Sequence, residues 1–393
     1  AQLAAQKGYS VTGSDRAHDP ENELFQNLEQ LGVIIHPQDG SGIDAATNQI
    51  VFSTAIESDN PELVKGRSLG IPSLHRAEFL SELIGDDELI AVAGTAGKTT
   101  TTGLLGWIFE CLGRDPSVYN GAAVLNWKTG AALGNVRAGN SNLWIIEADE
   151  SDQSFLRFHP THSIITNISK DHYELDELHA MFDQFERQTS KTTIRGDQLA
   201  PVELPVPMMG KHNEENARCA VALCEALGMD AAEVRAALSR FKGIERRLEV
   251  AGKVAGVTVI DDYAHNPAKI AAALSAVADE FETVHAYWRP HGFKPLAQGL
   301  DDFADVFSKH WKPRGGSIFV LPVYYAGGTV DKAIDSDALV DRLNSSGVPA
   351  VFAPDYDALQ SELTRRAQPG DAILGMGARD PELPRFAKKL IAE

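Results

Sequence analysis

The chain has 393 residues, of which 43% are hydrophobic and 23% charged, and its formal net charge is −19 at pH 7. This length accommodates two or three domains, and the composition is typical of a globular protein. The negative charge argues against a nucleic-acid or anionic-membrane surface, so we expect neither nucleic acid nor membrane as a partner. Cys111, Cys219 and Cys224 follow helical patterns beside apolar neighbours, which predicts buried thiols in a cytoplasmic protein.

Short β-branched segments alternate with helical patterns along the chain, which is typical of α/β domains with mainly parallel sheets. We expect three domains, at residues 1–85, 86–246 and 247–393. The first begins inside a helix, at 1–7, without the strand and glycine turn that normally precede it, so we expect this domain to be incomplete. Its predicted strands are 10–12, 33–35 and 50–53.

The second domain has predicted strands at 89–93, 143–146 and 163–166, and a helix that begins near Asn213. The segment 189–208 is polar, contains proline and shows little periodicity, so no strand is predicted there. The third domain has five predicted strands, at 257–260, 283–288, 318–321, 350–353 and 372–374.

The most informative segment is Gly-Thr-Ala-Gly-Lys-Thr-Thr at 94–100, between the strand 89–93 and a helical pattern. Glycines in such a turn let backbone N–H groups face phosphates, and the following helix N-terminus adds positive potential. Lys98 can reach the outer phosphates, and the Thr99 hydroxyl can meet Mg²⁺. Val92 stands where the more common motif has its first glycine, and an ordinary glycine-rich turn with a solvated lysine is the alternative interpretation.

Acidic residues follow the strand 143–146, from Glu147 to Asp152. Carboxylates at the carboxyl end of a parallel strand lie where open α/β sheets bind ligands, and Mg²⁺ beside nucleotide phosphates takes one or two of them. A solvated acidic turn is the alternative. His172 follows the next strand, where it can ligate a metal or contact a phosphate, or else be a surface or cap residue.

Polar residues at later positions suit a nucleotide as well. Asn213 and Asn216 lie three apart at a helix start, where they can cap the helix or bind a base. Arg247 lies at the second domain boundary and can reach a phosphate or form a linker salt bridge. Asp262 follows the strand 257–260, where it can bind a ribose hydroxyl or belong to an N-cap cluster.

Taken in order, six motifs closely resemble the Mur ligase family: G-T-x-G-K-T-T, E-A-D-E-S-D, T-N-x-x-x-D-H, G-K-H-N-x-x-N, R-R and D-D-Y-x-H-x-P. The resemblance covers nearly the whole chain. It implies an α/β fold of three domains: a Rossmann-like UDP-sugar-binding domain, a central P-loop-type ATPase domain with a mainly parallel sheet, and a Rossmann-like C-terminal domain that receives the amino acid.

The resemblance also implies roles for individual residues. The catalytic residues would be Lys98, Glu147 and His172, and the metal ligands Thr99, Glu147 and His172. ATP would be bound by Gly94, Thr95, Ala96, Gly97, Lys98, Thr99, Thr100, Asn213, Asn216, Arg247 and Asp262. The other substrates would be bound by Ser14, Asp15, Arg76, Ser151, His265 and His291.

The reaction implied is ATP- and Mg²⁺-dependent amide formation between the carboxylate of UDP-N-acetylmuramate and L-alanine, through an acyl phosphate, in peptidoglycan precursor synthesis. Addition of the tripeptide L-Ala-γ-D-Glu-meso-diaminopimelate in recycling is the alternative, although Ser151 favours alanine because the recycling enzymes tend to carry tyrosine there. A non-catalytic nucleotide-binding relative is the second alternative. We expect a monomer or weak dimer.

Overall fold

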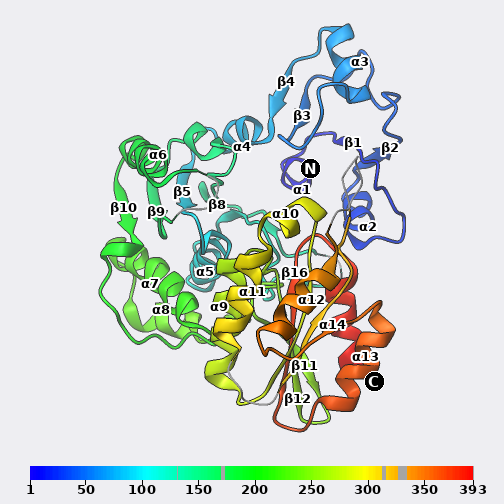
Figure 1. Ribbon diagram of the computed structural model, residues 1–393. Helices are drawn as coiled ribbons and strands as arrows, with labels where there is room; N and C mark the ends of the chain where they lie inside the picture. Colours follow the sequence, from blue (N-terminus) through cyan, green and yellow to red (C-terminus); the bar gives the residue numbers. More distant parts are fainter. Residues whose placement is uncertain (131, 170–172, 312–315, 326–333, 393) are drawn as a thin grey trace. The chain divides into compact units, whose positions relative to one another are not determined.

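The computed structural model describes residues 1–130, 132–169, 173–311, 316–325 and 334–392 (Figure 1). The chain divides into two compact units. The first contains residues 1–207 and 214–242, and the second contains residues 208–213 and 243–393. Each unit is organised around its own six-stranded, mainly parallel sheet, so the α/β fold class predicted from the sequence is confirmed.

The sheet of the first unit has the strand order β10-β9-β5-β8-β6-β7. All neighbouring strands are parallel except β7, which is antiparallel to β6. The strands are β5 (Glu88–Ala93), β6 (Ser117–Tyr119), β7 (Val136–Arg137), β8 (Leu143–Glu147), β9 (His162–Ile165) and β10 (Thr192–Arg195). The accompanying helices are α5 (Lys98–Cys111), α6 (Leu175–Gln188), α7 (Lys211–Ala226) and α8 (Ala231–Leu238), with a short 3₁₀ turn, η1 (Ser154–Arg157).

The central strand β5 is apolar along its length because both of its faces are covered. Leu89 and Ala91 pack in a cluster with Phe182 and other residues of α6. Since side chains alternate along a strand, the fully buried Ile90 and Val92 point to the opposite face. Helix α5 contacts both β5 and β8. Burial on both faces explains why β5 reads as a continuous apolar run in the sequence.

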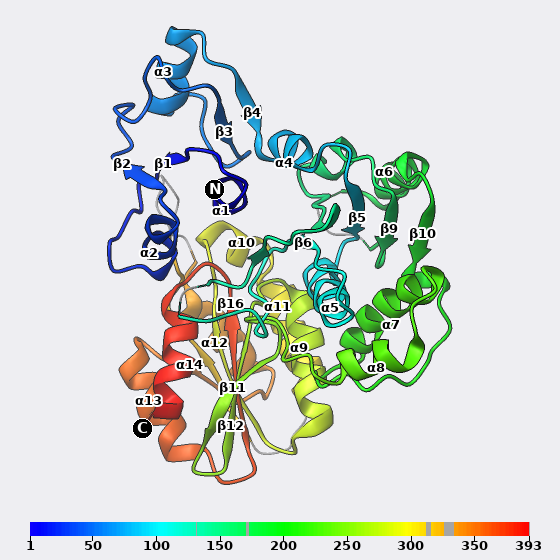
Figure 2. The same ribbon diagram turned by 180° about the vertical axis from the view of Figure 1, so that it is seen from behind.

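The first 84 residues form shorter α/β elements (Figure 2). Two parallel strand pairs are present, β1 with β2 and β3 with β4. The strand expected at 10–12 lies two residues later, at 12–14, whereas those expected at 33–35 and 50–53 are confirmed to within one residue. The elements are α1 (Gln2–Gln6), β1 (Thr12–Ser14), α2 (Glu23–Gln30), β2 (Ile34–His36), β3 (Ile50–Phe52), α3 (Pro61–Leu69), β4 (Ser73–His75) and α4 (Arg76–Ile84).

The sheet of the second unit has the order β11-β12-β16-β13-β14-β15, with β11 antiparallel to β12 and the rest parallel. Its strands are β11 (Glu249–Val254), β12 (Val257–Asp262), β13 (Val284–Arg289), β14 (Ile318–Val320), β15 (Ala350–Phe352) and β16 (Ala372–Gly377). All five strands predicted for this part of the chain are confirmed, and β11 is an additional one. The helices are α9 (Pro267–Glu280), α10 (Phe293–Gln298), α11 (Leu300–His310), α12 (Ser336–Ser345), α13 (Tyr356–Arg366) and α14 (Glu382–Ala392).

Two apolar clusters cover the two faces of this second sheet. Residues of α9, α11 and α12 pack on one face against Ile260 and Trp288, and residues of α13 and α14 pack on the other against Val259 and Tyr287. Consecutive residues of β12 and β13 therefore belong to opposite clusters, as the alternation of a strand requires. Figures 1 and 2 show the same arrangement, with α9 and α11 on one side of the sheet and α13 and α14 on the other.

Two sequence-based expectations need correction, one on the segment 189–208 and one on the cysteines. The segment 189–208 does contain a strand, β10, which pairs with β9 at the edge of the sheet. Cys219 and Cys224 are buried as expected, but Cys111 is half-buried. Within the residues described, no helix combines the length and the apolar character that a membrane span requires.

Candidate active site

Three loops converge at the carboxyl ends of β5, β8 and β9, which are neighbours in the sheet. The loop after β5 is the glycine-rich segment 94–97, and it leads directly into α5. The loop after β8 is the acidic segment, and the loop after β9 begins at Thr166. Because parallel strands end at the same edge, residues from distant parts of the sequence meet there.

Side chains after β9 hold the glycine-rich loop in place. The Oδ1 atom of Asn167 accepts hydrogen bonds from the Thr95 hydroxyl (2.7 Å) and from the Ala96 backbone N–H (3.1 Å). The Thr166 hydroxyl donates to the Ala96 carbonyl oxygen at 2.5 Å. Neither Thr166 nor Asn167 was expected from the sequence to contribute to the site. These hydrogen bonds fix the conformation of the glycine-rich loop.

Gly94 and Gly97 are required by both conformation and space. Their φ angles are 134° and 83°, where residues with a side chain are disfavoured. A Cβ atom on Gly94 would lie 2.0 Å from the Thr166 hydroxyl, and one on Gly97 would lie 2.0 Å from Oδ1 of Asn216 in α7. The glycines thus allow β9 and α7 to approach the loop closely, in addition to the role expected from phosphate binding.

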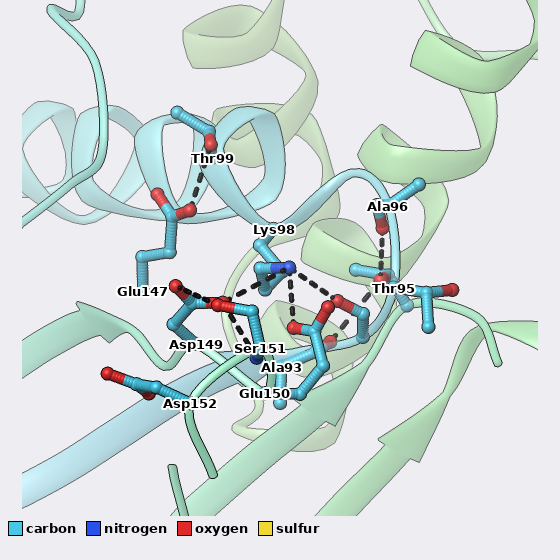
Figure 3. A network of polar contacts seen from close by, with 12 residues as sticks. Ala93, Thr95, Ala96, Lys98, Thr99, Glu147, Asp149, Glu150, Ser151 and Asp152 are labelled. Carbon is cyan, nitrogen blue, oxygen red and sulfur yellow. Dashed lines mark hydrogen bonds and ion pairs between the residues drawn. The ribbon is translucent and has the colours of Figure 1, made fainter. Parts of the chain in front are cut away.

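Lys98 is held by two oxygen atoms (Figure 3). Its ammonium donates to the Gly94 carbonyl oxygen at 2.8 Å and to Oε2 of Glu150 at 2.6 Å. A carboxylate oxygen of Asp149 lies farther away, at 4.0 Å. Burial raises the pKa of the Glu150 carboxyl above its ordinary value, and the Lys98 charge opposes that rise. The lysine that the sequence predicts for phosphate contact is therefore at the loop, paired with a carboxylate.

Thr99 and Glu147, the predicted metal ligands, lie side by side. The Thr99 hydroxyl donates to Oε1 of Glu147 at 3.0 Å (Figure 3). The Gly121 backbone N–H donates to Oε2 of Glu147 at 2.7 Å. A hydroxyl and a carboxylate are the hard oxygen donors that Mg²⁺ prefers, so this pair fits that ion. The predicted partner His172 lies outside the described residues. Among described residues, no group of three or more His, Cys, Asp or Glu side chains suitable for a metal occurs.

The two asparagines of α7 occupy different surroundings. Asn213 is buried and donates to the Met209 carbonyl oxygen at 2.7 Å. The side chain of Asn216 lies against Gly97, and the backbone carbonyl oxygen of Asn216 accepts a hydrogen bond from the Thr101 hydroxyl at 3.5 Å. Asn216 thus lies at the glycine-rich loop of the first unit, whereas Asn213 belongs to the segment 208–213 of the second unit. Thr100 is buried in the first turn of α5.

Four predicted substrate-binding residues lie in the first unit. Ser14 ends β1, and Asp15 follows it and accepts from the Ala17 backbone N–H at 2.8 Å. The Arg76 guanidinium lies 5.9 Å from the centre of the Tyr119 ring. The Ser151 hydroxyl donates to Asp149 at 3.0 Å.

In the second unit, residues 246–248 are fixed to the sheet. Arg246 donates to Oδ2 of Asp261 at 3.0 Å and to the Gly377 carbonyl oxygen at 2.7 Å. Asp262 accepts from the backbone N–H groups of Leu248 and Ala264, both at 2.8 Å. Both carboxyls are buried, and burial raises the pKa of Asp261 to about 6 and that of Asp262 above its ordinary value. These contacts place the neighbouring Arg247 at the carboxyl end of β12, with its guanidinium 5.6 Å from the centre of the Tyr263 ring.

His265 and His291 are brought together, although 26 positions separate them in the sequence. Their ring centres lie 5.4 Å apart, edge to face. Nδ1 of His265 lies 2.9 Å from the Tyr263 carbonyl oxygen. Burial lowers the pKa of His265 to about 4 and lowers the pKa of His291 as well. A neutral imidazole pair, suited to contact a polar substrate, therefore lies here.

Arg289 has an internal role that the sequence did not reveal. It donates to Oδ2 of Asp380 at 2.5 Å, and its guanidinium lies between the rings of Tyr324 and Tyr356, at 5.4 and 5.5 Å. Asp380 is buried and also accepts from the Tyr356 hydroxyl at 2.5 Å. This arginine therefore fixes the base of the segment that carries His291.

The first unit combines a parallel sheet, a glycine-rich loop, the Lys98-Thr99 pair and a glutamate that faces Thr99. This combination defines a protein that binds nucleotide phosphates. Three family models match the chain: Mur ligase family, catalytic domain, at 1–87; Mur ligase middle domain, at 92–187; and Mur ligase, glutamate ligase domain, at 246–379. The chain belongs to the Mur ligase family.

Individual relatives agree with this assignment. The UDP-N-acetylmuramate–L-alanine ligase of Maricaulis maris is 33% identical over 98% of this chain and 92% of its own length. That of Thermosynechococcus vestitus is 31% identical over 96% and 90%. The crystal structure of UDP-N-acetylmuramate-alanine ligase from Thermotoga maritima matches with a TM-score of 0.79 and 25% identity, over 99% and 94% of the two chains. A murein peptide ligase from Psychrobacter arcticus, with a TM-score of 0.63 and 21% identity over 100% and 95%, shares the fold.

Proposed function

We propose that this protein is an ATP-dependent ligase that joins L-alanine to the carboxylate of UDP-N-acetylmuramate in peptidoglycan precursor synthesis. The observation that carries the proposal is the 33% identity to a UDP-N-acetylmuramate–L-alanine ligase over 98% of this chain. The arrangement of Lys98, Thr99 and Glu147 supports it, because it suits phosphoryl transfer from ATP. We also propose that the enzyme works in the cytoplasm as a monomer or weak dimer.

In the proposed reaction, a carboxylate oxygen of the sugar nucleotide attacks the γ-phosphorus of ATP, and ADP leaves. The neutral amine of L-alanine then attacks the acyl carbon, and inorganic phosphate leaves with the pair of electrons of the broken C–O bond. The nitrogen loses one proton in this step, and the departing phosphate takes it up. Both steps bring anions together, so catalysis depends on neutralising them in place. Mg²⁺ would supply part of that charge and would be held by Thr99 and Glu147, with His172 proposed for a second ion.

The chain's own groups supply the rest. The backbone N–H groups of Thr95 and Ala96 already donate to Asn167. The other N–H groups of residues 94–100, at the N-terminus of α5, would receive the phosphates, and the Lys98 ammonium would contact the outer ones. Asp262 keeps lone pairs available beyond its two backbone partners, so a ribose hydroxyl can still donate to it. We assign the adenine to Asn213 and Asn216 and a phosphate contact to Arg247.

The remaining substrate contacts follow the position of each residue. We propose that Ser14, Asp15, Arg76 and Ser151 bind the sugar nucleotide, and that the neutral His265 and His291 contact the amino acid. A neutral imidazole suits that place because it can hydrogen-bond to an attacking amine without adding positive charge. In this scheme residues 1–85, 86–246 and 247–393 serve the sugar nucleotide, ATP and the amino acid, respectively.

The decisive experiment measures phosphate release by the full chain with UDP-N-acetylmuramate and Mg-ATP. Parallel reactions contain L-alanine, glycine, L-serine, D-alanine or the tripeptide L-Ala-γ-D-Glu-meso-diaminopimelate, and mass spectrometry identifies the product. We expect release and a new amide with L-alanine, and no release when the sugar nucleotide is omitted. Release with the tripeptide alone would overturn the proposal in favour of a recycling ligase, and release with none of them would favour a non-catalytic relative.

A further inference from the structure

The acidic segment after β8 contains a carboxylate with no role in the proposed reaction, and this group makes the shortest contact to Lys98. Glu150 lies 2.6 Å from the Lys98 ammonium, and its side chain is only 3% exposed. The Lys98 side chain is 13% exposed. A buried ion pair of this kind is geometrically demanding, because each charge needs the other in a fixed place.

The backbone around Glu150 is fixed by its own hydrogen bonds. The Gln153 N–H donates to the Glu150 carbonyl oxygen at 3.0 Å, and the Phe155 N–H donates to the Asp149 carbonyl oxygen at 3.1 Å. Phe155 is fully buried in the core beside α6. The turn is therefore anchored to the core, and it directs Glu150 inward toward the glycine loop (Figure 3).

The neighbouring acid provides a contrast within the same turn. Asp149 lies 4.0 Å from Lys98, is 41% exposed, and accepts hydrogen bonds from the backbone and hydroxyl of Ser151. Solvent screens such an exposed pair, so Asp149 contributes little to the position of Lys98. The two adjacent carboxylates thus have different surroundings, and only Glu150 is directly bonded to the ammonium.

The hydrogen bonds of the Lys98 ammonium show how the pairing with Glu150 orients it. An ammonium has three N–H donors, and the Gly94 carbonyl oxygen and Glu150 accept from two of them. In the described part of the chain, the third donor has no hydrogen-bond partner within the normal range. With two donors fixed on either side, the third has a restricted direction at the start of α5, where phosphates bind.

We propose that Glu150 is a positioning residue, which holds the Lys98 ammonium at the phosphate loop with one N–H donor left for the nucleotide. The contribution to catalysis rests on the proposed function, whereas the pairing itself does not. Glu150 thereby joins Glu147 as a second functional carboxylate of the same segment: Glu147 faces Thr99, and Glu150 faces Lys98.

Two variants and one matched control test the proposal. Glu150→Gln keeps the shape and one acceptor oxygen but removes the charge, and Glu150→Ala removes both. Asp149→Asn removes the same charge one residue away, while its oxygen can still accept from Ser151. Circular dichroism and thermal melting of each variant identify any loss of folding, and the isosteric Glu150→Gln carries the test if the alanine variant does not fold.

The first readout does not depend on ligase activity. The ligand-free proteins are treated with a limiting amount of acetic anhydride, and peptide mass spectrometry gives the labelling rate of Lys98. We expect the rate to rise in the order wild type, Glu150→Gln, Glu150→Ala, because the released side chain becomes accessible, and to stay within about twofold of wild type in Asp149→Asn. Equal rates in wild type and both Glu150 variants would overturn the proposal, whatever reaction the protein catalyses.

The second readout is steady-state kinetics with ATP and the amino acid. A loosely held lysine costs transition-state stabilisation, so we expect kcat/KM for ATP to fall by about tenfold in Glu150→Gln and further in Glu150→Ala, with the KM for the amino acid unchanged. Partial rescue by the glutamine distinguishes positioning from a purely structural role. Similar increases in the KM for ATP and in the KM for the amino acid, together with lower melting temperatures, would show a structural role and contradict the proposal.

Discussion

Each compact unit contains a buried pair of a cation and a carboxylate at its sheet, and the two pairs are built differently. In the first unit, the Lys98 ammonium is bonded to Glu150 and to one carbonyl oxygen. In the second, the Arg246 guanidinium bonds to Asp261 in β12 and to the Gly377 carbonyl oxygen in β16. A lysine is a compact charge on a flexible stem, whereas arginine is a planar fork that fits two acceptors at once.

The two cations therefore differ in whether they keep a hydrogen-bond donor for a ligand. Lys98 retains a donor for a ligand, which suits a catalytic charge that must respond to nucleotide. Arg246 connects two strands and holds a strained segment, since its own φ angle is 57° and that of Leu248 is 49°. The first pair therefore suits the proposed chemistry, and the second fixes the peptide that contains Arg247.

The largest expected effect tests the catalytic side of this comparison. Lys98→Ala should lower kcat/KM for ATP by at least about 10³-fold, because a charge aimed at the transferred phosphate is lost. The variant should still fold, but its melting temperature should be lower than that of the wild type, because the buried Glu150 carboxylate loses its partner. Phosphate-release kinetics and thermal melting check both statements, and unchanged turnover would remove Lys98 from the catalytic residues.

For Arg246 the main expected effect is on stability and not on the chemical step. Arg246→Ala should destabilise the protein by about 3 kcal/mol or more at pH 7, because it leaves the Asp261 carboxylate buried without a partner. Calorimetric unfolding measures the effect. The loss should be smaller at pH 5, where Asp261, with its pKa already near 6, is largely protonated. An equal loss at both pH values would show that the charge of Asp261 is not the cause.

The smallest effect concerns the pH dependence of stability. The pKa of Asp261 rises from 3.8 to about 6 on folding, so the folded state holds the proton more tightly and stability falls as the pH increases through this range. Asp261→Asn cannot titrate, and we expect its melting temperature to fall less than that of the wild type between pH 4 and pH 6.5. A steeper fall in the variant would contradict the assignment.

Much of the site could be predicted from the sequence because its residues stand at fixed distances from clear apolar strands. Lys98 and Thr99 follow β5, and Glu147 ends β8, so strand alternation and the glycine turn were sufficient to place them. The five parallel strands of the second unit were predicted for the same reason, since they form apolar runs, although the edge strand β15 is only partly buried.

What the sequence did not reveal depended on tertiary context. Strand β10, Thr-Thr-Ile-Arg, is a half-buried edge strand with no apolar run, and β11 shifts register near Gly252. The segment Glu147–Asp152 holds four acids, and nothing in their spacing indicates which one is buried. Glu150 becomes distinct only once the turn at Phe155 directs it toward Lys98. The partner of Arg289 could not be read from the sequence either, because Asp380 lies 91 residues away.

The close approach of Asn216 to Gly97 has a consequence for how this protein can change over time. Any side chain at position 97 meets Oδ1 of Asn216, so an ancestor could gain one only after position 216 had become smaller. Even then the left-handed backbone at 97 would resist the change. Substitutions at these two positions, 119 apart in the sequence, are therefore coupled. The order in which they occur decides which combinations of residues evolution can produce at the two positions.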